Sequence, residues 1–217
     1  MIVDLNIQNK TVIIIGGGNE AKKRINSLLK QNCEILVISD SVNTQINKLS
    51  KLKKIKIIKE KIEDTKFISK FKPHVIIITT NDKKINQRII KYAKRKRIIA
   101  YSSDNPEESD FSNPAIIDFP NTIQIAIFTG GQSPIMSKKI KDTSEKVFKK
   151  IITKEVIAQI KIQKIGREFA KEFIPSHTQR RECLRKITSD NEIDQLIKDG
   201  QIKKAEKRAI TIIRNWK

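Results

Sequence analysis

Residues 11–21 have the sequence TVIIIGGGNEA, and this stretch decides the fold. Its first five residues are mostly β-branched and apolar, which predicts a short buried strand. The pattern Gly16-x-Gly18-x-x-Ala21 follows directly, with the spacing of a dinucleotide-binding turn. The first glycine permits the tight turn, the second lets the backbone approach a pyrophosphate, and the alanine lets the next helix pack on the strand. We therefore predict that Gly16, Gly17 and Gly18 bind the phosphates of a dinucleotide.

An acidic residue stands at the matching distance from this turn. A helix is predicted over residues 22–30 and a second apolar strand over 34–38, and Ser39 and Asp40 follow this strand directly. Asp40 lies roughly 20 residues past the glycines, where such a unit places the acid that binds ribose hydroxyls. The next residues, Ser41, Val42 and Asn43, include no arginine for a 2′-phosphate. NAD is therefore predicted over NADP, and the alternative is a βαβ unit whose glycine turn binds nothing.

Strands and helices continue to alternate after Asp40. Further strands are predicted over residues 55–58, 75–78 and 98–101, and helices over 42–52, 67–71 and 85–94. The alternation predicts an α/β fold, an NAD-binding Rossmann domain with a parallel sheet and helices on both faces. Beyond it, residues 114–118 and 122–128 are β-like, and the remainder has helical spacing. The predicted division is a Rossmann domain over 1–112, a β/α dimerisation segment over 113–148 and a C-terminal helical domain over 149–217, with breaks at Pro175 and Gly200.

The chain is strongly basic. Its 217 residues carry a formal net charge of +21, and aromatic residues make up 5%. Nucleic-acid binding is one interpretation, but binders of single strands usually place stacking aromatics among the charges. A lysine-rich solvated surface is favoured over it, and a small polyanionic substrate drawn in by the protein's field fits better still.

Other features set the predicted location and exclude several classes of site. No apolar run approaches the roughly 18 residues of a membrane helix, and no basic region followed by an apolar core opens the chain. Cys33 and Cys183 form no disulfide framework, and no His/Cys cluster indicates a metal site. We expect a cytoplasmic protein without a bound metal or a membrane partner.

Polar residues collect at the carboxyl ends of the predicted strands, where open α/β sheets bind ligands. Thr79 and Thr80 follow the fourth strand and are expected to line the cofactor site. Asp104 follows the fifth strand and is the carboxylate best placed near a nicotinamide ring, as a candidate base. The alternative, of equal weight, is a turn-forming Asp before Asn105-Pro106.

A second glycine loop spans residues 129–134. Gly130 and Gly131 expose backbone amides, and Ser133 and Pro134 can begin a helix as N-cap and first residue. Such an end suits carboxylates, although a plain glycine turn has similar weight. Of the two histidines, His74 is expected to be structural, and for His177 a surface position is favoured over proton transfer.

Taken in order, these motifs resemble precorrin-2 dehydrogenase, the type that also forms the N-terminal part of sirohaem synthase. The resemblance runs to about residue 141. It comprises IGGG with Ala21, residues 15–21; TND followed by NQR, 80–88; Asp104 with Pro106 and Phe111; PAIID, 114–118; and IAIFTGGQSP, 125–134.

The resemblance implies NAD-dependent oxidation of precorrin-2 to sirohydrochlorin by a homodimer joined through the segment after the Rossmann domain. Some members also insert ferrous iron, so ferrochelation stays open. Asp104 matches an aspartate that is important for function in the family. Cofactor contacts carry over to Asn19, Glu20, Asp40 and Ser41, and the loop of Thr129, Gly130, Gly131 and Ser133 is assigned to the substrate.

The sequence departs from the family pattern at four places. Glu20 replaces an apolar residue, Asn81 replaces an Asp, residues 101–103 replace Asn-Val-Val, and Ser109 stands where many members have Cys. The loss of the Asp weakens any inference about chelation. Precorrin-2 carries many carboxylates, so a basic cleft between the Rossmann sheet and the helical domain is expected to attract it.

Two alternative functions, neither of them enzymatic, are considered beside the dehydrogenase. A non-catalytic NAD-sensing regulator would lack polar residues such as Asp104 near the nicotinamide. A nucleic-acid binder would show strongly salt-dependent binding.

The alternating segment 122–128 is too short to form a sheet of its own, so we expect it to pair across the two-fold axis of a homodimer.

Overall fold

The computed structural model describes residues 2–119 and 122–216. The chain forms two compact units, Met1–Asn113 and Pro114–Lys217. Each unit has its own secondary structure and its own buried core, so they are described separately.

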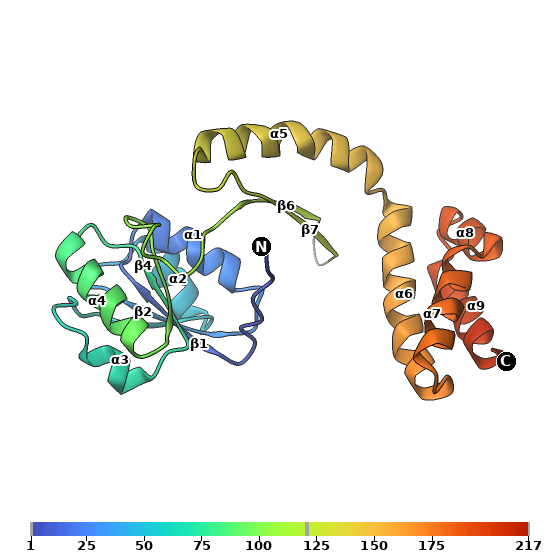
Figure 1. The fold of residues 1–217 in the computed structure, drawn as a ribbon, viewed down its shortest axis with the longest axis horizontal. Coiled ribbons are helices and arrows are strands. Elements are labelled where there is room, and N and C mark those ends of the chain that lie inside the picture. The colour runs from blue at the N-terminus through green and yellow to red at the C-terminus, as the bar shows by residue number, and fades with distance from the viewer. Residues whose placement is uncertain (1, 120–121, 217) are drawn as a thin grey trace. The chain divides into compact units, whose positions relative to one another are not determined.

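The first unit is built on a five-stranded sheet (Figure 1). Its strands are β1 (Thr11–Ile15), β2 (Glu34–Ile38), β3 (Lys56–Ile58), β4 (Val75–Ile78) and β5 (Ile99–Ser102). Their order is β3-β2-β1-β4-β5, and each neighbouring pair is parallel. The predicted parallel α/β sheet is confirmed, and β1 lies at its centre.

Four helices connect the strands: α1 (Asn19–Leu28), α2 (Thr44–Lys51), α3 (Lys66–Phe71) and α4 (Lys83–Arg95). Alternate residues of β1 enter two different cores, as the pleat requires. Val12 and Ile14 pack with Ile25 of α1, and Ile13 and Ile15 pack with Ile89 of α4. Helices therefore cover both faces of the sheet, as predicted.

The helix ends differ from the predicted ones by a few residues. Helix α1 begins at Asn19, three residues before the predicted start, because the chain enters it directly from Gly18. Helix α4 begins at Lys83 because Asp82 caps it, accepting hydrogen bonds from the backbone N–H groups of Lys84 and Ile85 at 3.1 Å. Hydrophobic periodicity locates the buried face of a helix, whereas capping groups decide where the helix begins.

The second unit begins with a hairpin of β6 (Ala115–Phe119) and β7 (Ile123–Ile127). The strands are antiparallel, with Ile117 opposite Ile125. The alternating segment therefore pairs with a strand of its own chain, which corrects the expectation that it is too short to form a sheet. Pairing with a second copy across a two-fold axis stays a prediction.

Five helices follow the hairpin within the described residues: α5 (Pro134–Ile151), α6 (Lys154–Phe173), α7 (His177–Thr188), α8 (Asn191–Lys198) and α9 (Ile202–Arg214). Helices α6–α9 share one core, which includes Ile162, Cys183 and Ile213. The predicted breaks are confirmed, since Pro175 lies between α6 and α7 and Gly200, at φ +72°, lies between α8 and α9. The boundary expected at residue 148 falls inside α5, which continues to Ile151.

Candidate cofactor and substrate site

Two of the fingerprint glycines are required by close packing. Gly16 has φ +105°, and a Cβ there would lie 2.7 Å from Oγ1 of Thr79. A Cβ on Gly17 would lie 2.0 Å from the carbonyl oxygen of Ser41 and 2.7 Å from Cα of Val42. The predicted tight turn at Gly16 is confirmed. The steric need at Gly17 arises from residues more than twenty positions away, so no local pattern indicates it.

Gly18 has a different environment. It is exposed, and a Cβ built on it meets no atom within 4 Å. It stands as the N-cap of α1, and no side chain caps that helix end. The first N–H groups of a helix lack intrahelical partners and carry a partial positive charge. The open end of α1 therefore has both the space and the donors that a pyrophosphate requires.

The loop after β2 is bonded to this glycine turn. Asp40 and Ser41 are exposed, and the Ser41 hydroxyl donates to Oδ1 of Asp40 at 3.3 Å. The backbone N–H of Asn43 donates to the Gly17 carbonyl at 2.9 Å, and its Nδ2 donates to the Gly18 carbonyl at 3.4 Å. The predicted ribose-binding acid thus lies beside the phosphate turn. Asn43 was missed as a site residue, although an Asn before a helix is a typical N-cap and it caps α2.

Glu20 is neutralised by two cations of its own helix. Its carboxylate pairs with Arg24 and with Nζ of Lys23, the latter at 3.2 Å. Partial burial opposes ionisation, but the charges and hydrogen bonds of Arg24 and Lys23 prevail and lower the pKa of Glu20. Arg24 also donates to the hydroxyl of Tyr101 at 3.2 Å and lies over its ring. The negative charge of Glu20 at the start of α1 is therefore compensated by Arg24 and Lys23, so Glu20 repels a bound phosphate less than an unpaired carboxylate would.

Both predicted threonines direct their hydroxyls into the protein. Thr79 Oγ1 donates to the Ile15 carbonyl at 2.8 Å, which ties the end of β4 to the end of β1. Thr80 Oγ1 donates to Oδ1 of the buried Asn86 at 2.5 Å, and Nδ2 of Asn86 donates back to the Thr80 carbonyl at 3.0 Å. The Thr79 hydroxyl therefore supports the strand end before the glycine turn, and the Thr80 hydroxyl supports the first turn of α4. Both hydroxyls stabilise the backbone around the candidate cofactor site.

Asp104 is exposed and follows β5. The hydroxyl of the buried Ser102 donates to its Oδ1. The adjacent turn is closed by Asn105, whose Oδ1 accepts the backbone N–H of Glu108 at 3.3 Å. The side-chain contact that the structure gives Asp104 is therefore with Ser102, and the turn-forming bond comes from Asn105.

The acidic loop beyond Asp104 covers the outer edge of β5. Asp110 accepts the backbone N–H of Ala100 at 2.8 Å, and Ser109 Oγ accepts that of Ser102 at 2.9 Å. These bonds satisfy backbone groups that an edge strand would otherwise expose. Ser109, one of the departures from the family pattern, thus helps to hold the strand that carries Ser102 and leads to Asp104.

The second glycine loop lies in the second unit. Gly130 and Gly131 have φ +65° and +77°. Ser133 caps α5 by accepting the N–H of Met136 at 3.2 Å, and Pro134 is the first helical residue, as predicted. Thr129 Oγ1 lies 2.9 Å from the Ser137 hydroxyl and accepts the N–H of Ser133 at 3.2 Å. The side chains of Thr129 and Ser133 are therefore engaged inside the loop.

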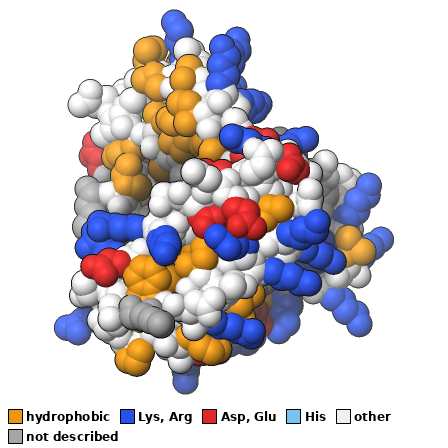
Figure 2. All heavy atoms as spheres, turned by 90° about the vertical axis from the view of Figure 1, so that its right-hand side faces the viewer, with side chains coloured by type: hydrophobic (Ala, Val, Ile, Leu, Met, Phe, Trp, Pro, Cys, Tyr) orange, Lys and Arg blue, Asp and Glu red, His pale blue; other side chains and the backbone are white. Residues whose placement is uncertain are grey.

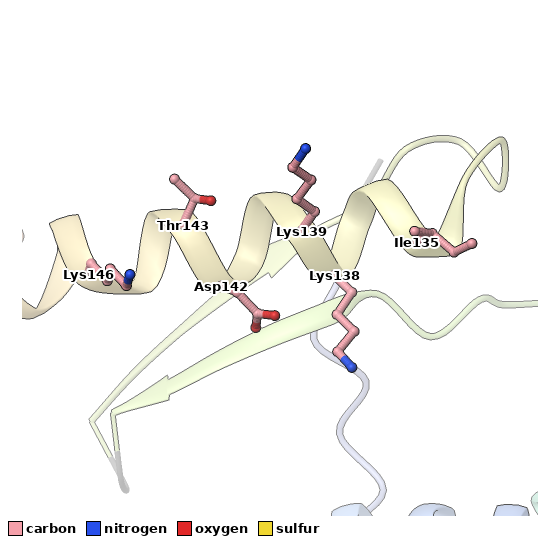
Figure 3. A pocket seen from close by; sticks show the side chains of 6 residues that line it. All are labelled: Ile135, Lys138, Lys139, Asp142, Thr143 and Lys146. Carbon is pink, nitrogen blue, oxygen red and sulfur yellow. The ribbon is translucent and has the colours of Figure 1, made fainter.

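A shallow hollow lies along the first turns of α5. It is lined by Lys138, Lys139, Asp142 and Thr143, among others. In Figure 3, Lys138 and Asp142 extend from one side of the helix, whereas Lys139 and Thr143 extend from the other. The lysines do not converge on one point, so the hollow lacks a focused cationic centre.

The structure thus brings together part of the predicted site. The three fingerprint glycines, Asp40, Ser41 and Thr79 share the carboxyl edge of the sheet, and Asp104 follows the strand two places from β1. His74 is structural as predicted, since its Nδ1 accepts the N–H of Thr11 at 3.2 Å. Both cysteines are free thiols.

Within residues 2–119 and 122–216, no group of three His, Cys, Asp or Glu side chains could hold a metal ion. None of the helices in these ranges is long and apolar enough to cross a membrane.

Comparisons with known proteins agree with the geometry. A family model described as "Putative NAD(P)-binding" matches residues 3–115. The siroheme synthase of Actinobacillus pleuropneumoniae serotype 3 (strain JL03) is 25% identical over 202 residues, which are 93% of this chain and 40% of that protein. The "Putative precorrin-2 dehydrogenase" of Methanocaldococcus jannaschii is 29% identical over 198 residues, 89% of this chain and 92% of that protein.

Among solved structures, the chain is similar to "SirC, precorrin-2 dehydrogenase". The TM-score is 0.72 at 20% identity, covering 96% of this chain and 99% of that one, which shows a shared fold. The chain spans about 40% of the length of the siroheme synthase that it matches.

These relatives bear the names that the motifs predicted, so the suspected resemblance is confirmed. The family model covers just over half of the chain and includes the glycine turn, Asp40 and Asp104. The protein therefore belongs to the NAD(P)-binding family that this model describes.

Proposed function

We propose that the protein is an NAD-dependent dehydrogenase that oxidises precorrin-2 to sirohydrochlorin in siroheme biosynthesis. The observation that carries this proposal is the open N-terminal end of α1 at Gly18, bonded to the loop that presents Asp40. A relative that this chain matches over most of its length bears the name "Putative precorrin-2 dehydrogenase", which supports the choice of substrate.

The residues at the sheet edge fit a dinucleotide. The open space at Gly18 and the uncapped start of α1 would hold the pyrophosphate, and the exposed Asp40 carboxylate would accept hydrogen bonds from the ribose. NAD, when bound, supplies the acceptor for the hydride that leaves the macrocycle. Asp40 disfavours a 2′-phosphate by charge repulsion, so NAD is the preferred cofactor.

Asp104 is the proposed general base. Oxidation of precorrin-2 removes one hydride and one proton, so a proton acceptor is needed beside the cofactor. The Ser102 hydroxyl binds Oδ1 of Asp104 and orients the carboxylate, while Asn105 forms the turn. Because Asn105 and not Asp104 forms the turn, the contacts favour Asp104 as a general base over Asp104 as a turn former.

A homodimer is part of the proposal. The exposed side chains of Met136, Ile140, Val147 and Ile151 follow helical spacing on α5, and an exposed apolar row of this kind is typical of an interface. We expect sedimentation at micromolar concentration to give twice the mass of the chain. A monomer at that concentration would contradict the dimer.

The activity is tested by incubating the protein anaerobically with precorrin-2 and NAD. NADH and sirohydrochlorin should appear together in the absorption spectra, with NADP less effective than NAD. A parallel reaction with ferrous iron, a substrate of the chelation step, asks whether sirohydrochlorin is converted further. Absence of NADH from folded protein that binds NAD would refute the dehydrogenase.

Replacing Asp104 by Asn isolates the base. Asn keeps the size of the side chain but cannot accept the proton, so turnover should fall by at least about 10²-fold. NAD affinity should stay within about twofold, because the groups that hold the pyrophosphate are unchanged. Single-turnover NADH formation measures the rate of oxidation, and fluorescence titration measures the affinity for NAD. Wild-type turnover in the Asn variant would exclude Asp104 as the base.

A further inference from the structure

The feature that the proposed function leaves unexplained is a groove between α6 and α7, here called the α6–α7 groove. It has a volume of about 740 Å³, within the roughly 300–1,000 Å³ typical of ligand pockets. Five cationic side chains line it: Arg167, Lys171, Arg180, Arg181 and Arg185. The half-buried Leu184 adds apolar surface.

Overall composition does not account for this cluster. Lysines and arginines together number 45 in the chain, of which 35 are Lys and ten are Arg. Four of the ten arginines line the α6–α7 groove, beside a single lysine. Lysine and arginine side chains together are spread over the face shown in Figure 2, among acidic and apolar ones. The groove differs in its share of arginine, which supplies four of its five cations but only ten of the 45 in the chain. Arginine differs from lysine in its planar fork, which binds carboxylates through two parallel hydrogen bonds.

The charges of the groove are uncompensated. Among the described residues, none of the five cations forms an ion pair within 4.0 Å, and no acidic side chain lines the groove. Glu168, Glu172 and Glu182 belong to the same two helices but lie outside the lining. Like charges held close together repel, and an anionic ligand relieves that repulsion.

The two helices that form the groove are firmly joined. A Cβ on Gly166 would lie 3.3 Å from Cδ2 of Leu184, so glycine permits the close approach of α6 to α7. Nε2 of Gln163 donates to the Leu184 carbonyl at 3.0 Å and to Oγ1 of Thr188 at 2.8 Å. The backbones that carry the arginines are therefore positioned before any ligand arrives, which lowers the entropy cost of binding.

We propose that the α6–α7 groove binds the carboxylate side chains of a polycarboxylate macrocycle. This inference rests on the proposed function, because precorrin-2 is such a macrocycle. The arginine forks would hold the carboxylates, and the half-buried Leu184 would contact the apolar ring. The groove lining contains no Phe, Tyr or Trp, and His177 is its one ring on which a nucleic-acid base could stack, so a small carboxylate ligand is favoured over a single strand.

Binding is tested with uroporphyrin, a stable fluorescent macrocycle with acetate and propionate side chains. The variant R181Q/R185Q removes two charges from exposed groove positions, and K203Q/K204Q removes two exposed charges from α9 as the matched control. We expect the Kd for uroporphyrin to rise at least about tenfold in the groove variant and less than about twofold in the control. Equal weakening in the two variants would show an effect of net charge alone and would overturn the proposal.

Two further measurements sharpen the result. R181K/R185K keeps the charge but loses the forks, so its affinity should fall between those of the wild type and R181Q/R185Q. A single-stranded oligonucleotide serves as the competing ligand. If R181Q/R185Q weakens oligonucleotide binding but leaves uroporphyrin binding unchanged, the groove is a nucleic-acid site and the inference fails.

The outcomes separate this inference from the proposed function. If the wild type reduces NAD with precorrin-2 and R181Q/R185Q has unchanged uroporphyrin affinity, the dehydrogenase stands and the groove inference fails. If uroporphyrin binds through the groove but precorrin-2 yields no NADH, the groove stands and the dehydrogenase fails. Circular dichroism and the thermal midpoint of each variant verify that the helices α6–α9 remain folded.

Discussion

The two glycine loops of this protein have similar sequences but different structures. Each links a strand to a helix, residues 16–18 before α1 and residues 129–133 before α5. In the first loop, distant residues crowd Gly16 and Gly17, while Gly18 and the helix end stay open. In the second loop, Gly130 and Gly131 have only loose contacts, and Ser133 closes the helix end.

The difference shows how a glycine turn becomes a phosphate site. A helix end can bind an anion only if its own side chains leave the N–H groups free. The end of α1 meets this condition. At α5, Ser133 Oγ already accepts the backbone N–H of Met136. The Ser133 carbonyl in turn accepts hydrogen bonds from the hydroxyls of Thr129 and Ser137. If this loop binds the substrate as predicted, the groups left for that contact are chiefly the backbone amides of Gly130 and Gly131.

The largest expected effect comes from Gly17→Ala. The new Cβ would lie 2.0 Å from a backbone oxygen, so the loop after β2 must shift, at a cost of about 3 kcal/mol of unfolding free energy. Urea denaturation followed by circular dichroism measures this loss. Unchanged stability would show that the 39–43 loop is free to move away and that the first loop is not rigidly packed.

Gly18→Ala should separate binding from folding. A Cβ there meets no atom within 4 Å and φ is −84°, so the unfolding free energy should change by less than about 0.5 kcal/mol. The methyl group would occupy space that the pyrophosphate needs, so the Kd for NAD should rise at least about tenfold. Isothermal titration with NAD tests this. Unaltered affinity would mean that the phosphates bind elsewhere, which would remove the contrast between the loops.

The smallest expected effect is that of Ser133→Ala in the second loop. Loss of the N-cap bond to Met136 should cost about 1 kcal/mol of stability, measured by thermal unfolding. NAD affinity should be unchanged, because the cofactor-binding turn belongs to the other unit. A fall in NAD affinity comparable with that of Gly18→Ala would contradict the separate roles of the two loops.

Local pattern was sufficient for much of the fold. The five strands and four helices of the first unit follow from apolar runs and glycine spacing, because β-branched runs and helical periodicity act within a few residues. The N-cap at Ser133 and the breaks at Pro175 and Gly200 were predictable for the same reason. Exact helix ends were less predictable, because one capping side chain such as Asp82 can move a start by two residues.

Contacts between distant segments could not be predicted in this way. Asp104 was identified by its position after the fifth strand and by the family resemblance, and the bonds of Ser102 and Asn105 favour its role as a base over that of a turn former. Ser109 matters through its bond to Ser102, because the acidic loop folds back along β5. Neither contact has a periodic signature in sequence.

By itself, the sequence determined the alternation of strands and helices, the dinucleotide-binding turn and the acid that follows it, because these depend on spacing within one βαβ unit. Tertiary structure alone decided that Gly17 must be a glycine, since the oxygen that would clash belongs to Ser41. It also decided that Arg167 shares a groove with Arg181 and Arg185, since antiparallel packing of α6 and α7 brings these separate positions together. The physical reason is that steric exclusion and clustered charge depend on distances in space, which the order of residues does not specify.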